Sequence, residues 1–296
     1  MRQLMLCGMV VLAALMLLNT SGAQTNGKDE FPRTRDLTPQ TDLMHGQSVF
    51  VFTKYRLKKT RPATAKPNPQ PPPHPRNGTR KPPAAPPVEV TWKRLGVTVW
   101  RWTQGADAAE PVRVSADTKF NVGEKVRLQF ESAEAGYLYV FDREVYTDGT
   151  YGEPLLVFPT MMSHMGMNKV EPGRVIDIPS DSDNVKFFTL KSSDQRWKGE
   201  ALTVIVSPEP LNNIQIPGSP THIPGAIFQS LLAVDMWPVG EYDLDGANGS
   251  KLTVQEKAAA VGTRELTLTD AYPQTMFKAQ LPQQASLFAK IDLIAK

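Results

Sequence analysis

The sequence predicts a mainly β protein: an antiparallel β-sandwich with one or two short helices in its carboxyl-terminal part, preceded by a disordered, basic, proline-rich linker. From residue 88 onward, short stretches rich in β-branched and aromatic residues alternate with clusters of Gly, Pro, Asn and Asp. No long helical pattern lies between them, which favours antiparallel sheets packed face to face. Residues 54–87, in contrast, hold runs of proline, which allow neither a helix nor a central strand.

Residues 1–23 are typical of a secretory signal peptide. Arg2 precedes an apolar run from Leu4 to Leu18, and Ser21 and Ala23 provide small residues before Gln24. The run is shorter than the roughly 20 residues that a membrane-spanning helix needs. We therefore expect export to the periplasm or the extracellular space and no transmembrane segment in the mature chain, with an uncleaved anchor as the alternative.

The only cysteine, Cys7, lies inside this predicted signal. The mature chain then has no disulfide, no thiol nucleophile and no cysteine-ligated metal centre. A domain of this size without disulfides is expected to be held together by its own apolar core.

Residues 24–53 are expected to form an amino-terminal extension. Its one candidate strand is Val49–Phe52, which would pair with the later domain across the linker. The linker itself occupies residues 54–87 and is expected to be extended, because proline-rich segments favour the polyproline II conformation.

The charge of the chain is divided between the linker and the domain. Residues 54–94 carry eleven Lys and Arg and a single acid, Glu89, whereas the formal net charge of the whole chain is only +3. One interpretation is a solvated spacer, and the other is attachment to an envelope protein or an anionic polymer. Nucleic acid is not expected, because the chain carries a secretory signal and no aromatic residues interleave the basic run.

The sandwich domain is expected over residues 88–296. In Lys125–Glu131, apolar and polar residues alternate with a period of two, which predicts a strand with one face in solvent. Further strands are expected at 96–102, 137–141, 155–158, 174–179, 186–190, 201–206, 265–269, 275–279 and 286–294. The pair Asp148–Gly149 is expected at the tip of a hairpin, since this pair tolerates the positive φ such a turn requires.

Two short helices are expected after the strand-rich part. One covers Ala226–Val234. The other begins at the capping box Thr253–Glu256, in which Thr and Glu each bond the other's backbone N–H, and ends at Gly262.

No catalytic signature of the serine-hydrolase, zinc-protease, P-loop or dinucleotide-binding type is present, and the four histidines are scattered. We therefore expect no enzyme and no cofactor. Glu241–Ser250 places oxygen ligands at Asp243, Asp245 and Asn248, as calcium loops do, but the closing glutamate is missing. An ordinary Asp- and Gly-rich turn is the interpretation we favour there.

One loop after Pro159 is rich in methionine. It contains the copper candidates Met161, Met162, His164, Met165 and Met167. Thioether sulfur selects Cu(I), so a copper-handling protein is one hypothesis. Methionine is also flexible and common on adaptable contact surfaces, so a packing or contact loop is the hypothesis we favour.

Residues 115–211 resemble the bacterial domain of unknown function family 4384. The resemblance rests on motifs that follow one another in order: a Phe-x-x-Gly-Glu strand start, a Gly-Tyr-Leu-Tyr-Val strand, a Leu-x-Phe-Pro strand end, an Asn-x-Val-x-x-Gly turn, an Ile-Pro strand end and a closing Ser-Pro-Glu-Pro-Leu. Here they are Phe120, Gly123, Glu124; Gly136–Val140; Leu156, Phe158, Pro159; Asn168, Val170, Gly173; Ile178, Pro179; and Ser207–Leu211.

The resemblance implies an extracytoplasmic β-sandwich module, with residues 115–211 as its core and 212–296 as a carboxyl-terminal extension. The family has no established catalytic residues, so none are carried over to this chain. The methionine-rich loop departs from the family, which has a short loop in this place. Together these observations predict a non-catalytic secreted or periplasmic binding or structural module of the cell envelope, with copper handling as the alternative.

Overall fold

The computed structural model describes residues 44–50, 89–102, 110–115, 117–233, 237–244, 247–258, 263–267 and 270–296. The predicted signal peptide and linker lie outside these residues. Within the described part, no helix combines the length and the apolar character needed to cross a lipid bilayer.

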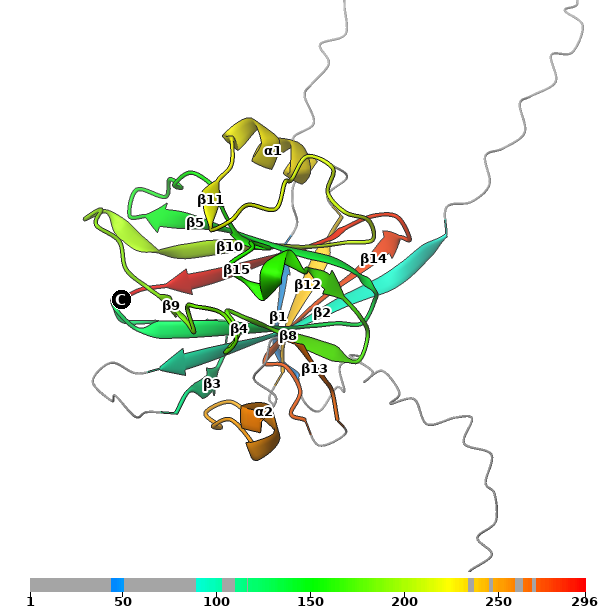
Figure 1. The fold of residues 1–296 in the computed structure, drawn as a ribbon, viewed down its shortest axis with the longest axis horizontal. Coiled ribbons are helices and arrows are strands. Elements are labelled where there is room, and N and C mark those ends of the chain that lie inside the picture. The colour runs from blue at the N-terminus through cyan, green and yellow to red at the C-terminus, as the bar shows by residue number, and fades with distance from the viewer. Residues whose placement is uncertain are drawn as a thin grey trace, which may run out of the picture. The chain divides into compact units, whose positions relative to one another are not determined.

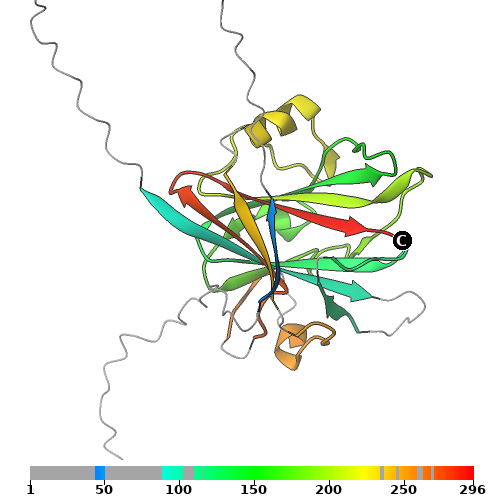
Figure 2. The same ribbon diagram turned by 180° about the vertical axis from the view of Figure 1, so that it is seen from behind.

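The predicted mainly β fold is confirmed: the described chain forms two antiparallel sheets (Figures 1 and 2). The large sheet has the order β1-β12-β14-β2-β4-β8-β13, with β3 paired to β2 and β9 to β4. Its strands are β1 Met44–Phe50, β2 Val90–Trp102, β3 Val112–Val114, β4 Lys125–Ser132, β8 Arg174–Ile178, β9 Phe188–Thr189, β12 Val239–Leu244, β13 Thr263–Glu265 and β14 Thr275–Pro282.

The small sheet has the order β11-β6-β5-β10-β15, with β7 paired to β5. Its strands are β5 Gly136–Tyr146, β6 Leu155–Phe158, β7 Lys169–Val170, β10 Trp197–Ser207, β11 Thr221–His222 and β15 Leu287–Ile294. The helices of the described residues are α1 Gly225–Ala233, α2 Val254–Ala258 and the short 3₁₀ helix η2 His164–Gly166.

The main core lies between the sheets. Leu128 and Phe130 of β4 meet Leu138 and Val140 of β5 in one apolar cluster, and all four side chains are buried. These residues are two apart along each strand because successive side chains of a strand point to opposite faces.

Helix α1 covers the outer face of the small sheet (Figure 1). Tyr139 and Phe141 point to this face, and the rings of Phe141 and Phe228 pack edge to face with centroids 5.5 Å apart. The helix expected at Ala226–Val234 is thus found at Gly225–Ala233.

Helix α2 lies against the outer face of the large sheet, on the opposite side of the molecule from α1. Its predicted capping box is confirmed: the Thr253 N–H donates to Glu256 Oε2 at 2.8 Å, and the Glu256 N–H donates to Thr253 Oγ1 at 3.1 Å. The expected stop at Gly262 lies outside the described residues.

The expectation of a solvent-exposed face on β4 is wrong. Arg127, Gln129 and Glu131 are all buried, although they alternate with the apolar core residues. Arg127 is covered by the segment that follows β8, where it pairs with Asp181 and donates to the Lys186 carbonyl oxygen. This face of β4 is polar but not exposed to solvent, because other polar groups cover it.

Several strand limits also differ from those expected. The extension holds its strand at Met44–Phe50 instead of Val49–Phe52, and this strand pairs with β12. Strand β13 begins at Thr263 and ends at Glu265, where the sequence predicts a strand over 265–269. The reason is a turn: the Asp270 carboxylate accepts the Thr267 N–H at 2.6 Å. The hairpin turn is confirmed, with Gly149 at φ +81°.

Candidate functional site

The methionine-rich loop joins β6 to β7, and hydrogen bonds from neighbouring segments hold its backbone in place. The buried Asp183 carboxylate accepts three hydrogen bonds: from the His164 N–H at 3.0 Å, the Ser163 hydroxyl at 3.1 Å and the Ser180 N–H at 2.8 Å. One acid therefore ties this loop to the segment after β8. The Met161 and Met162 N–H groups donate to the carbonyl oxygens of Pro217 and Gly218 at 2.8 and 3.1 Å.

Two residues of the loop adopt a left-handed conformation. His164 and Met165 both have φ +52°, a region in which residues other than glycine are rarely found. Such a conformation costs on the order of 1–3 kcal/mol and persists where the surroundings enforce it. The hydrogen bonds to Asp183 supply that enforcement, and this combination is common at functional sites.

His164 belongs to the scaffold of the loop. Its side chain is buried, Nε2 lies 2.7 Å from the Asp177 carbonyl oxygen, and the ring packs on Phe158 with centroids 5.4 Å apart. Because a carbonyl oxygen only accepts hydrogen bonds, Nε2 carries the proton and donates it. Nε2 is therefore engaged in this hydrogen bond and is not available as a metal ligand.

The four methionine side chains of the loop are exposed to solvent, in contrast to the buried His164 ring. Met161, Met162, Met165 and Met167 are 57, 45, 72 and 62% exposed. They line a groove of about 860 Å³ whose remaining wall comes from β7, β8 and the segment around Asp183. The loop thus combines a fixed backbone with four flexible apolar side chains that stand in solvent.

The rim of this groove is charged. Glu171 lies 3.2 Å from the Lys169 ammonium and 3.5 Å from the Arg174 guanidinium. All three side chains are exposed, so these ion pairs contribute little to stability. They give the rim two cations and one anion.

The structure gives a partial test of the metal hypotheses. Among the described residues, no group of three or more His, Cys, Asp or Glu side chains is placed to hold a metal ion. Of the calcium candidates, Asp243 lies in β12 and accepts the Thr275 hydroxyl at 3.4 Å, Asn248 lies in the following turn, and Asp245 lies outside the described residues. A copper ion in the loop would have the thioethers and His164 Nδ1 as ligands, since His164 Nε2 donates to the Asp177 carbonyl oxygen.

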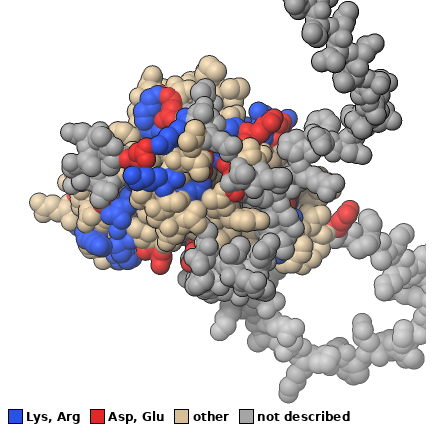
Figure 3. All heavy atoms as spheres, turned by 90° about the horizontal axis from the view of Figure 1, so that it is seen from below, with Lys and Arg blue, Asp and Glu red and all other residues tan. Residues whose placement is uncertain are grey.

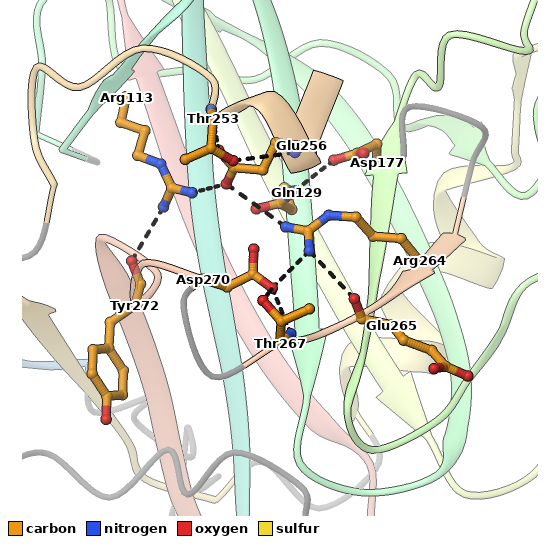
Figure 4. A network of polar contacts seen from close by, with 10 residues as sticks. All are labelled: Arg113, Gln129, Asp177, Thr253, Glu256, Arg264, Glu265, Thr267, Asp270 and Tyr272. Atoms are coloured by element: carbon orange, nitrogen blue, oxygen red, sulfur yellow. Dashed lines mark hydrogen bonds and ion pairs between the residues drawn. The ribbon is translucent and has the colours of Figure 1, made fainter. Parts of the chain in front are cut away.

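A network of buried charges fastens α2 and β13 to the large sheet (Figure 4). Glu256 pairs with Arg113, and Arg264 lies 3.7 Å from Glu256 and 2.8 Å from Asp270. The Arg113 guanidinium also stacks on the Trp100 ring, 4.6 Å from its centroid. Each of these two acids is paired with a cation, so we interpret the network as structural.

The surface on the same side of the molecule also places acids beside cations. Viewed from there, Asp and Glu lie among Lys and Arg over the described residues (Figure 3). Glu110, for example, pairs with Lys257 and lies 3.9 Å from Lys251.

A second pair of acids has no such cations, and sequence reasoning missed it. Asp142 of β5 and Glu200 of β10 meet at one end of the space between the sheets, beside a cavity of about 410 Å³. The sequence did hold a signal for the pair. In β5 the inward residues Leu138 and Val140 are followed at the same spacing by Asp142, and in β10 the inward residues Leu202 and Val204 are preceded at that spacing by Glu200.

Burial raises the pKa of both carboxyl groups. The pKa of Asp142 rises to about 6 through burial. That of Glu200 rises to about 9 through burial and through the neighbouring Asp142 carboxylate. The pair therefore holds one proton at neutral pH, because two adjacent buried carboxyl groups cannot both be charged.

Comparison with known proteins gives no relative: no family model, no curated protein and no solved structure matches this chain. The likeness of residues 115–211 to family 4384 therefore stays a prediction from the sequence motifs.

Proposed function

We propose that this chain is an exported, non-catalytic binding module of the cell envelope, and that it contacts another envelope protein through the methionine-lined groove. One observation carries the proposal: four exposed methionines stand on a loop whose strained backbone is held by the buried Asp183. Methionine adapts its shape at low cost and is common on surfaces that bind proteins. A fixed backbone lowers the entropy lost when such a surface binds.

The occupant that fits the groove is a protein segment with an apolar side chain beside an acidic one. The apolar side chain would lie among Met161, Met162 and Met165, and the acidic one near the Lys169 and Arg174 side of the rim. Export, expected from residues 1–23, and the likeness to extracytoplasmic modules support a partner in the envelope.

The partner can be identified with a photoreactive amino acid at position 162 of the full-length chain in exporting cells. The purified partner is then titrated against the wild type and against Met162→Gln with Met165→Gln, which keeps side-chain length and removes apolar character. We expect the affinity to fall at least about tenfold, or ~1.4 kcal/mol. The matched control is Val254→Thr, because Val254 is 83% exposed and lies outside the groove.

Equal affinity of the wild type and the double variant would reject the groove as the contact site. The non-catalytic part of the proposal has its own test: specific hydrolysis of an envelope substrate, lost in Glu200→Gln, would contradict it.

The basic segment supports a second contact, with an anionic envelope polymer. Its eleven cations stand against one acid in residues 54–94. Retention on purified anionic polymer should fall steeply with salt, because exposed charges are screened within about 8 Å at physiological ionic strength. Deleting residues 54–81 should abolish this retention, and unchanged retention would exclude the contact.

Copper handling by Met161, Met162, His164, Met165 and Met167 is the competing function, and the exposure of four thioethers in one loop is what favours it. An anaerobic Cu(I) titration separates the two. We expect no sub-micromolar binding. Tight stoichiometric binding that Met162→Leu with Met165→Leu removes would replace protein docking by copper handling.

A further inference from the structure

The cavity beside Asp142 and Glu200 is separate from the methionine-lined groove, and no residue lines both. It opens at one end of the sandwich, between β5, β6 and β10 of the small sheet and β4 and β9 of the large one. Its walls are largely apolar, with Val126, Leu155, Phe188, Leu190, Leu202 and Leu293 among the lining residues. Its volume of about 410 Å³ is in the range of small-molecule sites.

Strand register brings the two acids together. In the antiparallel pair of β5 and β10, Asp142 lies opposite Leu202 and Glu144 lies opposite Glu200. Asp142 and Glu200 are thus diagonal neighbours on the inner face of the sheet, a distance that long side chains bridge. The alternation that buries Leu138 and Val140 turns Asp142 inward as well.

The two acids have few other donors. No N–H or hydroxyl group of the described residues donates to Asp142 Oδ1 or Glu200 Oε2, and the two carboxyl groups hydrogen-bond to each other through the proton that they share. The other oxygen of Glu200 accepts the Trp197 Nε1–H at 2.9 Å. A ligand with several N–H donors could therefore take the place of the shared proton and donate to both carboxylates.

The remaining charged groups make the cavity acidic. Glu144, which accepts the Tyr146 hydroxyl at 2.7 Å, and Glu153 also line it. Against these four carboxyl groups stand the Lys191 ammonium and the His222 imidazole. A ligand with a positive charge is therefore favoured over a neutral or anionic one.

We propose that this cavity binds an aliphatic ammonium group, with the ammonium between Asp142 and Glu200 and the alkyl body against the apolar walls. An ammonium group has three N–H donors and no acceptor, which suits two neighbouring carboxyl groups that have one proton between them. A divalent cation fits less well, because no group of three or more His, Cys, Asp or Glu side chains among the described residues is placed to hold a metal ion.

Binding has a measurable proton balance. The empty pair holds one proton, and the incoming ammonium is itself charged. The ammonium takes the place of the shared proton, which leaves for the buffer, and the complex then contains two carboxylates and one ammonium. The heat of binding at pH 8 should therefore differ between two buffers in proportion to their ionisation enthalpies.

The test is calorimetric titration of the full-length chain with n-hexylamine. We expect one site per chain, proton release, and at least about tenfold weaker binding by both Asp142→Asn and Glu200→Gln, or ~1.4 kcal/mol. The control Glu209→Gln removes an exposed acid that lines neither the cavity nor the groove, and it should bind like the wild type. Thermal melting of each variant verifies that it is folded.

Two probes define the ligand class. Hexan-1-ol has the same chain without the charge, and binding as tight as that of hexylamine would overturn the proposal. Nα-acetyl-lysine methylamide carries the same ammonium on a peptide unit: tighter binding than hexylamine assigns the site to a protein lysine, and weaker binding assigns it to a free amine. No hexylamine binding at millimolar concentration, or equal binding by Glu200→Gln, would reject the site.

Discussion

Two regions of this protein each bring two acidic side chains together away from solvent, and only one of these regions supplies cations. On the outer face of the large sheet, Glu256 and Asp270 lie against Arg113 and Arg264 (Figure 4). On the inner face of the small sheet, Asp142 and Glu200 lie against each other. Buried charge as such therefore does not mark a site: the paired charges hold the fold together, and the unpaired ones are available to a ligand.

The largest effect is expected in the paired region. Glu256→Gln leaves the Arg113 and Arg264 guanidinium groups without their shared carboxylate. Removing one partner of a buried pair costs about 3–5 kcal/mol, and the free energy of unfolding in urea should fall by that amount. Glu265→Gln, an exposed acid on the same segment, is the control and should change it little. A loss below about 1 kcal/mol for Glu256→Gln would show that the network contributes little to stability.

The unpaired region should respond in the opposite direction. Glu200→Gln removes a group that must take up a proton on folding, and it keeps an acceptor for Trp197. We expect the variant to be more stable than the wild type by about 1–3 kcal/mol at pH 8, because the variant avoids this protonation step. Denaturant unfolding of both proteins at pH 8 measures this. A destabilised variant would mean that the two regions do not differ as described.

The pH dependence sharpens the same contrast. The folded-state pKa of Glu200 is about 9, whereas its ordinary value is 4.5. The folded state therefore holds this proton more tightly than the unfolded state, and stability from this group is lost as the pH rises between these two values. The stability difference between the wild type and Glu200→Gln should grow across that window. A difference that is constant from pH 5 to 9 would contradict the raised pKa.

The smallest effect is expected at the surface, outside both regions. Met162→Gln with Met165→Gln should change the free energy of unfolding by less than about 0.5 kcal/mol per site, because both side chains are exposed. Asp183→Asn should cost more, since this carboxylate accepts three hydrogen bonds. Thermal melting of the two proteins compares them. Similar losses would mean that the methionines are part of the core and not a contact surface.

The same contrast explains what the sequence could predict. Alternation identified the apolar core residues of β4 and β5 correctly, because burial of one face is a local property. Alternation cannot distinguish a solvent-exposed polar face from one that other charged groups cover. The sequence therefore predicts Gln129 and Glu131 in solvent, whereas both are buried. The cover comes from far along the chain: Asp177, which accepts the Gln129 amide N–H, is 48 residues away from it.

The candidate site shows the same limit. Composition alone drew attention to the methionine loop, and the structure adds that His164 faces inward while the methionines face out. Asp142 and Glu200 lie on strands that pair only in the folded chain. In the sequence, each is a single acid within an apolar strand. The register of the two strands, which brings the acids together, could not be derived from one sequence.

The position of β1 changes the meaning of the basic segment. Strands β1 and β2 belong to the same sheet, with β12 and β14 between them. Three strand spacings separate them, or about 14 Å. The chain between them is thus a loop by connectivity, anchored in the same sheet at both ends. A single proteolytic cut in that loop would not release its amino-terminal half: β1 would stay attached through its ladder with β12.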